Sequence, residues 1–121
     1  MKKKYRLLKR PDFEKTLKRG TKVSSSNFIC YYLKDLSSLN IRIGIIIPKK
    51  KCKSSPNRKY LKRLFWAFSR EENLNFFPKV KCVFFYRSEF LQNFSKKRVN
   101  FEEMRLDFLS VVLRIENRVN K

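Results

Sequence analysis

The chain has 121 residues, of which 31 are Lys or Arg, 10 are Asp or Glu and none is His, so its formal net charge is 31 − 10 = +21. Without His, the Ser–His and Cys–His nucleophile pairs are excluded, two glycines are too few for a Gly-rich phosphate loop, and 42% hydrophobic residues are too many for a disordered basic tail. We therefore predict one domain over residues 1–121, with a strongly anionic partner such as nucleic acid.

In the first half of the chain, the pattern predicts a basic arm, a helix and two strands. The arm is residues 1–9, and a proline near the first turn with a glycine as stop predicts a helix over 11–19. Residues 27–33 are apolar at both alternating sets of positions, which favours a strand covered on both faces. Residues 41–47 are rich in β-branched side chains and end at a proline, so we expect a second strand that forms a hairpin with the first.

The second half alternates between helices and a strand. A Ser–Pro pair opens a predicted helix over 55–70, and residues 80–86 predict a third strand. The segment 88–99 is ambiguous and contains a short helical piece, and an Asn-based capping box opens a last helix over 100–118. The predicted fold class is α+β, with the order α-β-β-α-β-α around one central sheet.

The three cysteines and the N-terminal segment bear on the compartment. Cys30, Cys52 and Cys82 are odd in number and widely spaced, which is typical neither of a zinc site nor of a disulfide framework. No apolar stretch of signal-peptide length follows the basic N-terminus, and no apolar run is long enough to span a bilayer. These features predict a cytoplasmic protein with reduced thiols and without a membrane partner.

Positive charge is concentrated in one acid-free interval. No Asp or Glu lies between Asp35 and Glu71, yet that interval holds ten Lys or Arg, eight of them within residues 49–63. A solvated basic face is the ordinary interpretation of such a cluster. Like charges one turn apart repel each other in a helix, however, and no carboxylate is interspersed here. Phosphate binding is therefore the favoured function of the interval.

Short motifs run in one order along nearly the whole chain: Arg6-Leu7, Asp12-Phe13, Gly20, the strand 28–33, Arg42-Ile43-Gly44, Lys49-Lys50 and Lys62-Arg63. Together they resemble the protein subunit of bacterial ribonuclease P. The family's signature is Arg-Asn-Arg, then one apolar residue, then Lys-Arg, and it is altered in this chain. With Lys62-Arg63 as the anchor, the first three positions fall on Arg58-Lys59-Tyr60. They fall instead on Asn57-Arg58-Lys59 if one residue is inserted before Lys62.

The resemblance implies a subunit without catalytic residues, metal ligands or a small-molecule substrate of its own. The RNA subunit would cleave precursor tRNA with bound Mg²⁺, while the protein binds that RNA and the single-stranded 5′ leader. The fold implied is a small α/β sandwich with a left-handed crossover, and the implied leader cleft contains Phe13, Leu17 and Tyr31. Charge and resemblance together predict these RNA-binding residues: Lys49, Lys50, Lys53, Asn57, Arg58, Lys59, Lys62 and Arg63.

Other interpretations stay open at this point. Phe13 and Tyr31 fit ordinary core packing as well as a cleft, and we assign Trp66, Phe84 and Phe85 to the core. A ribosomal or general RNA-binding protein without a role in cleavage would have the same composition. A nuclease acting alone is poorly supported, because the few acids of the first half do not share a helix face.

Overall fold

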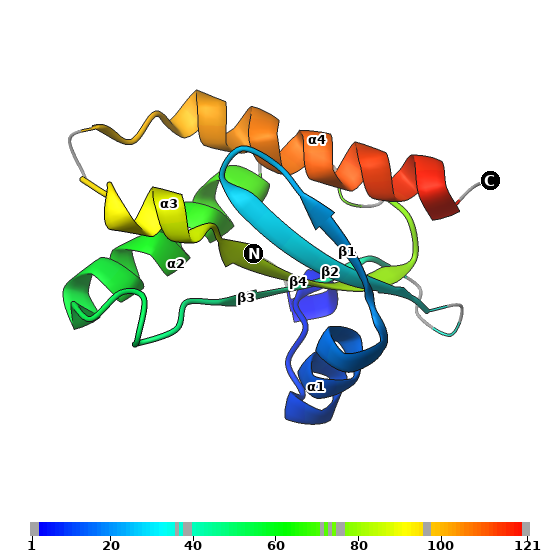
Figure 1. The fold of residues 1–121 in the computed structure, drawn as a ribbon. Coiled ribbons are helices and arrows are strands. Elements are labelled where there is room, and N and C mark those ends of the chain that lie inside the picture. Colours follow the sequence, from blue (N-terminus) through cyan, green and yellow to red (C-terminus); the bar gives the residue numbers. More distant parts are fainter. Residues whose placement is uncertain are drawn as a thin grey trace.

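The computed structural model describes residues 3–35, 37, 40–70, 72, 74, 77–95 and 98–119. One twisted sheet carries helices on both of its faces (Figure 1). The helices are the 3₁₀ turn η1 (Lys3–Tyr5), α1 (Arg10–Arg19), α2 (Ser55–Ser69), α3 (Ser88–Gln92) and α4 (Phe101–Val119). The strands are β1 (Thr21–Ser24), β2 (Phe28–Lys34), β3 (Arg42–Ile46) and β4 (Val80–Tyr86). The predicted α+β class is confirmed; β1 and η1 were not expected, and α3 lies in the segment 88–99, where a short helical piece was expected.

The predicted hairpin between the strands at 27–33 and 41–47, which are β2 and β3 in the structure, is wrong. The strand order is β1-β2-β4-β3, so β4 lies between β2 and β3, antiparallel to the first and parallel to the second. The reason lies in burial, because β4 is apolar on both faces and Val83 and Phe84 are both fully buried. Such a strand belongs in the centre of a sheet. The β3–α2–β4 segment is the parallel crossover, and its left hand remains a prediction.

One face of the sheet closes against α2 and α4 in a core of aromatic rings. Five phenylalanines there are fully buried, and neighbouring ring centroids lie 5.2 to 6.0 Å apart: Phe28, Phe65, Phe68, Phe84 and Phe108. Cys30 and Cys82 are buried in the same layer, as their apolar strands predict. Edge-to-face and tilted contacts of this kind add to the stability from burial.

Two of the core assignments need correction. Trp66 is only half-buried, and the guanidinium carbon of Arg6 lies 4.8 Å from the centroid of its ring, in a cation–π contact. Phe85 is half-buried on the opposite face of the sheet, where its ring packs edge-on against Tyr31 with centroids 6.1 Å apart. Phe85 follows Phe84 in a strand, so the two must point to opposite faces.

The opposite face is covered by α1 and, at Gly44, also by Leu7 of the N-terminal segment. The distal edge of the Phe13 ring lies against β3 at Gly44, where a Cβ atom would come within 2.3 Å of the ring. At the start of β4, Lys81 Nζ contacts Asp12 Oδ1 of α1 at 3.0 Å and Asp35 Oδ2 at 3.6 Å. The missing side chain at Gly44 and this ion pair together set how closely α1 approaches the sheet.

Part of the basic N-terminal segment packs against the sheet. Tyr5 and Leu7 are buried, Arg6 forms a parallel bridge with Ile43, and the Leu7 amide donates to the Ile43 carbonyl at 2.8 Å. The edge of β3 offers unpaired backbone groups, and the alternation of charged and apolar residues lets one side of the segment cover that edge.

The helix boundaries agree with the sequence to within a few residues. The α2 cap is Ser54, one residue before the predicted one, and its Oγ accepts from the Asn57 amide at 3.3 Å. At α4, Asn100 Oδ1 accepts from the Glu103 amide at 3.1 Å, which confirms the predicted cap. Within the described residues no helix is both long and apolar enough to cross a membrane.

Candidate nucleic-acid interface

An apolar hollow lies beside α1, on the face of the sheet that this helix only partly covers. Its volume is about 460 Å³, and we call it the apolar hollow; it is lined by Leu8, Arg10, Phe13, Glu14, Leu17 and Ile46. Phe13 and Leu17 stand one turn apart on α1, so the helix presents both to the same side. The structure therefore brings two of the three predicted cleft residues together.

Tyr31 does not line the apolar hollow, although it points to the same face of the sheet. The sheet register places Tyr31, Val83 and Gly44 side by side in one row across β2, β4 and β3. Phe13 covers the Gly44 end of that row, and half-buried Tyr31 stands at the other end against Phe85. Ile29, Phe85 and Ile46 form the next row on this face.

A second hollow of about 360 Å³ follows the edge of β3 on the side of α2, and we call it the basic hollow. It is lined by Ile45, Ile46, Ile47, Ser55, Arg58, Lys59 and Lys62. Ile46 also lines the apolar hollow. The two hollows therefore share Ile46 at the edge of β3, and we call the surface from α1 across this edge to the first turns of α2 the groove.

Arg58 has a structural role within this groove. Its Nη1 donates to the carbonyl of Cys52 at 2.8 Å and to that of Lys53 at 3.0 Å. The side chain thereby ties the loop before α2 to the helix and is half-buried, whereas Lys59 and Lys62 are exposed. The lysine ammonium groups are the more accessible donors in the basic hollow.

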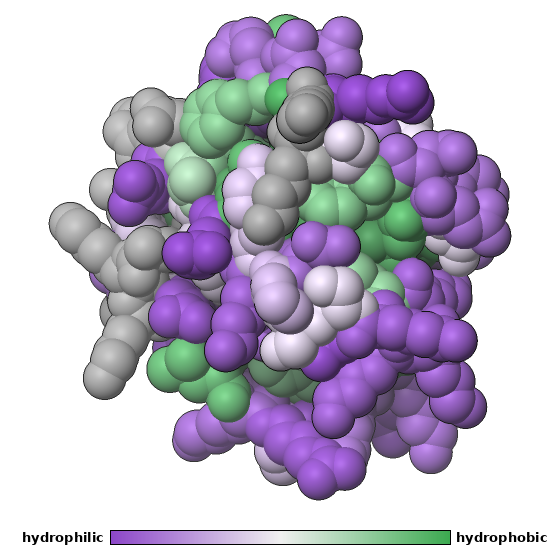
Figure 2. Space-filling model, turned by 90° about the vertical axis from the view of Figure 1, so that its left-hand side faces the viewer, coloured by the Kyte–Doolittle hydropathy of each residue, from purple (hydrophilic) through white to green (hydrophobic). Residues whose placement is uncertain are grey.

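The other predicted RNA-binding residues lie around the basic hollow rather than in it. Lys49, Lys50 and Lys53 are exposed in the loop between β3 and α2, and Arg63 is exposed on α2. Asn57 is half-buried, and its backbone amide is used in the helix cap. Figure 2 shows the face that carries the first turns of α2 and α3, where hydrophilic side chains surround a smaller apolar area.

The carboxylates near the groove and at the base of α1 are paired with basic or hydroxyl side chains. Glu14 is the one carboxylate that lines either hollow among the described residues, and Arg10 pairs with it at 3.1 Å. At the base of α1, hydrogen bonds from Ser37 and the charge of Lys81 lower the pKa of Asp35, while Asp12 raises the pKa of Lys81. The carboxylates that could repel an anion are thus neutralised by partners.

The groove has the chemistry of a binding site. In the described part of the chain, no three His, Cys, Asp or Glu side chains lie close enough together to hold a metal ion. What the groove offers is an apolar, aromatic end that can pack against a base and a cationic end that can contact phosphates. Sequence reasoning missed Leu8 and Ile46, although alternation from Gly44 along the strand would have put Ile46 on the α1 face.

Fold and surface together define a small α+β protein with one mixed sheet and a cationic groove along its edge strand. The family model Ribonuclease P matches residues 1–115, and the chain belongs to this family. The ribonuclease P protein component of Mycoplasmopsis synoviae is 33% identical over 109 residues, which cover 89% of this chain and 93% of that protein. That of Lactobacillus helveticus is 29% identical over 99 residues, 82% of this chain and 80% of the relative.

Other relatives match over less of their length. The component from Listeria monocytogenes serotype 4a is 44% identical over 50 residues, so this match spans 42% of that protein. Among solved structures, the RNase P protein of Thermotoga maritima in complex with 1-(4-fluorophenyl)-2-thiourea aligns with a TM-score of 0.78 and 28% identity, covering 92% of this chain and all of that one. A Staphylococcus aureus RNase P protein with 20% identity and a TM-score of 0.68, covering 92% and 94%, shows the shared fold alone.

Proposed function

We propose that this chain is the protein subunit of ribonuclease P. In this proposal it binds the RNA subunit through the basic residues of the loop before α2 and of α2 itself. It also holds the single-stranded 5′ leader of precursor tRNA in the groove. The RNA subunit performs the endonucleolytic cleavage with Mg²⁺, which is held mainly by RNA, and the complex works in the cytoplasm. The observation that carries the proposal is that the apolar and basic hollows share Ile46 at the edge of β3.

The shape of the groove favours a single strand over a duplex. Its apolar end lies between α1 and the sheet, where Phe13 is half-buried and held by the absence of a side chain at Gly44. A paired base cannot enter such a space, whereas an unpaired base can pack on the aromatic ring. Leu17 has no aromatic face, so stacking in this chain depends on Phe13.

The basic end supplies affinity without sequence preference. Lys59 and Lys62 are exposed side chains one turn apart, and each phosphate that they neutralise releases counterions. Because no acid is interspersed between residues 36 and 70, the local field favours a polyanion along the whole helix. A general RNA-binding protein is the alternative, and it differs from our proposal in having no effect on cleavage.

The test is reconstitution with a bacterial ribonuclease P RNA and a precursor tRNA at low Mg²⁺. We expect the protein alone to be inert, the RNA alone to be slow and the mixture to be fast. Cleavage by the protein alone would contradict the proposal, and a mixture no faster than RNA alone would favour a general RNA-binding role.

A leader-dependent variant sharpens the assignment of the groove. Phe13→Leu keeps apolar contact with Gly44 but removes the aromatic face, so it should weaken binding of a substrate with a leader of several nucleotides about tenfold. A substrate without a leader should bind equally well to both proteins. Equal losses for the two substrates would place the leader elsewhere.

For the basic hollow, Lys59→Ala with Lys62→Ala should lower the salt dependence of RNA-subunit binding by about 1.5 in the log–log slope. The matched control is Lys22→Ala with Arg114→Ala, which removes the same charge from exposed residues of β1 and α4. An equal drop in slope for the control pair would show that only net charge matters.

A further inference from the structure

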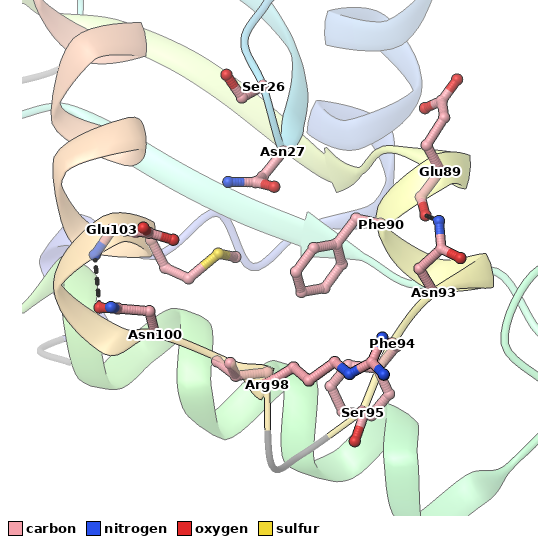
Figure 3. A pocket seen from close by; sticks show the side chains of 12 residues that line it. Ser26, Asn27, Glu89, Phe90, Asn93, Phe94, Ser95, Arg98, Asn100 and Glu103 are labelled. Carbon is pink, nitrogen blue, oxygen red and sulfur yellow. Dashed lines mark hydrogen bonds between the residues drawn. The ribbon is translucent and has the colours of Figure 1, made fainter.

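A third hollow of about 360 Å³ lies away from the groove, between the β1–β2 turn, α3 and the start of α4 (Figure 3). Its lining differs in kind from that of the other two. It contains two phenylalanines, three asparagines, two glutamates and one arginine: Phe90, Phe94, Asn27, Asn93, Asn100, Glu89, Glu103 and Arg98. Neither the family resemblance nor the groove accounts for this combination.

The aromatic wall of this hollow is held in place from behind. Phe90 stacks on Tyr86 with ring centroids 5.0 Å apart and an interplanar angle of 16°. Tyr86 is fixed in turn, because its hydroxyl donates to the Leu61 carbonyl of α2 at 2.8 Å. One face of Phe90 is therefore occupied, and Figure 3 shows its ring directed into the hollow. A rigid, half-buried ring is the surface on which a planar group can stack at little entropic cost.

Asn27 is equally well placed and has an unused side chain. Its backbone amide donates to Asp107 Oδ2 at 2.9 Å, and its carbonyl accepts from the Arg87 amide at 2.8 Å. Its side-chain amide makes no hydrogen bond to any residue that the structure describes, and it points into the hollow beside Phe90 (Figure 3). By contrast, Asn93 and Asn100 use their amides within α3 and in the α4 cap.

Glu103 brings a carboxylate to the same place. It stands one turn before Asp107 on α4, so both face the β1–β2 turn that holds Asn27. Its backbone amide serves the helix cap, but its carboxylate has no ion pair or hydrogen bond with another described residue. Glu89, the other acid, is paired with Arg87 at 3.2 Å. A hydrogen bond from its own backbone amide, together with the Arg87 guanidinium, lowers the pKa of the Glu89 carboxyl.

The two carboxylates decide what can enter. A phosphate would be repelled, and a free cation would be opposed by the net charge of +21. A neutral planar group with adjacent N–H donors satisfies both constraints, provided that it is carried by a polyanion. Guanine is such a group, because its N1–H and amino group are adjacent donors for one carboxylate and its O6 accepts from an amide. Uracil would place carbonyl oxygens against the carboxylate.

We propose that this hollow binds one unpaired guanine of an RNA, stacked on Phe90 and read by Asn27 and Glu103. Arg98 lies at the rim, where it extends toward Phe94 and can meet the neighbouring phosphate (Figure 3). Phe94 contacts the ring of Tyr60, the residue after Lys59 on α2, at 5.9 Å between centroids. The guanine pocket is thus in contact with α2, the basic helix. The proposal of this pocket rests on the proposed function only in requiring that the chain binds RNA.

The test compares two short RNAs, an eight-nucleotide oligouridine and the same strand with one central guanine, by fluorescence anisotropy at fixed ionic strength. Wild-type protein should bind the guanine-containing strand about tenfold more tightly, a typical gain for one well-matched base contact. Asn27→Ala and Glu103→Gln should each remove most of that preference and leave binding of oligouridine unchanged. The matched controls Asn117→Ala and Glu116→Gln, further along α4, should keep the preference.

The outcomes separate the two proposals. Normal binding of oligouridine without a guanine preference would overturn the guanine pocket and leave the groove intact. A preference that survives both Asn27→Ala and Glu103→Gln would also overturn it, because guanine would then be bound elsewhere. Competition by spermidine that depends on Glu103, without a guanine preference, would identify a cation site instead. A folded wild-type protein that binds neither RNA strand would overturn both proposals.

Discussion

The two faces of the sheet are built from the same strands, but helices cover one face fully and the other only in part. On one face, α2 with 15 residues and α4 with 19 close over aromatic rings that are fully buried. On the other, α1 with 10 residues lies over Gly44 and the start of β4 and leaves Ile46 and Phe85 half-exposed. Both faces are apolar in the sequence, so the difference comes from the area of helix available to cover each. The closed face stabilises the fold, and the partly open face leaves apolar surface for a ligand.

The largest expected effect is on the closed face. Phe65→Ala should destabilise the protein by about 3–5 kcal/mol, because it empties a site among four other buried rings. Phe85→Ala on the open face should cost less than half of that, since its ring is already partly in water. Urea unfolding followed by circular dichroism measures both. Equal losses would show that the open face carries as much of the stability as the core.

A smaller effect is expected where α1 meets the sheet. Gly44→Ala places a methyl group 2.3 Å from the Phe13 ring, so the ring or α1 must shift, at a cost of about 1–3 kcal/mol. In a Phe13→Ala background the same change should cost much less, because the conflicting ring is gone. A double-mutant cycle from urea unfolding measures this coupling. Additive losses would mean that Gly44 matters for its backbone rather than for the approach of Phe13.

The smallest effect concerns the ion pairs at the base of α1. Lys81→Met should destabilise the fold by about 1 kcal/mol or less, since the side chains of Lys81, Asp12 and Asp35 are 16–28% exposed and partly screened. Lys79→Met, a neighbouring exposed lysine, is the control and should be neutral.

The pH dependence tests the same contact. The pKa of Asp35 is lowered on folding, so its stabilisation is present above the unfolded pKa near 3.8 and is lost as the pH falls through the lower folded value. The stability gap between wild type and Lys81→Met should therefore shrink below about pH 4. A gap that stays constant down to pH 2.5 would mean that the lysine acts through packing alone.

The candidate site could be predicted in its residue types more than in its geometry. Charge density selected Lys59 and Lys62, and the resemblance selected Phe13 and Leu17, and all four line the hollows at the edge of β3. Arg58 was predicted as a contact, but its bonds to two loop carbonyls could not be inferred from a pattern of charges. Hydrogen bonds to backbone carbonyls depend on where the loop folds back, which residue spacing alone does not determine.

What the sequence determined by itself is local. Alternation and helical periodicity determined the segments that form β2, β3, β4 and the three longer helices, although not β1. The acid-free interval located the basic surface, because its charge also depends on neighbours within a few residues. Tertiary structure decided the position of β4 between β2 and β3, the docking of Tyr5 and Leu7, and the meeting of the two hollows at Ile46. These features depend on which helix or strand packs against each apolar face. A strand pattern shows that a face must be buried but does not show which element buries it.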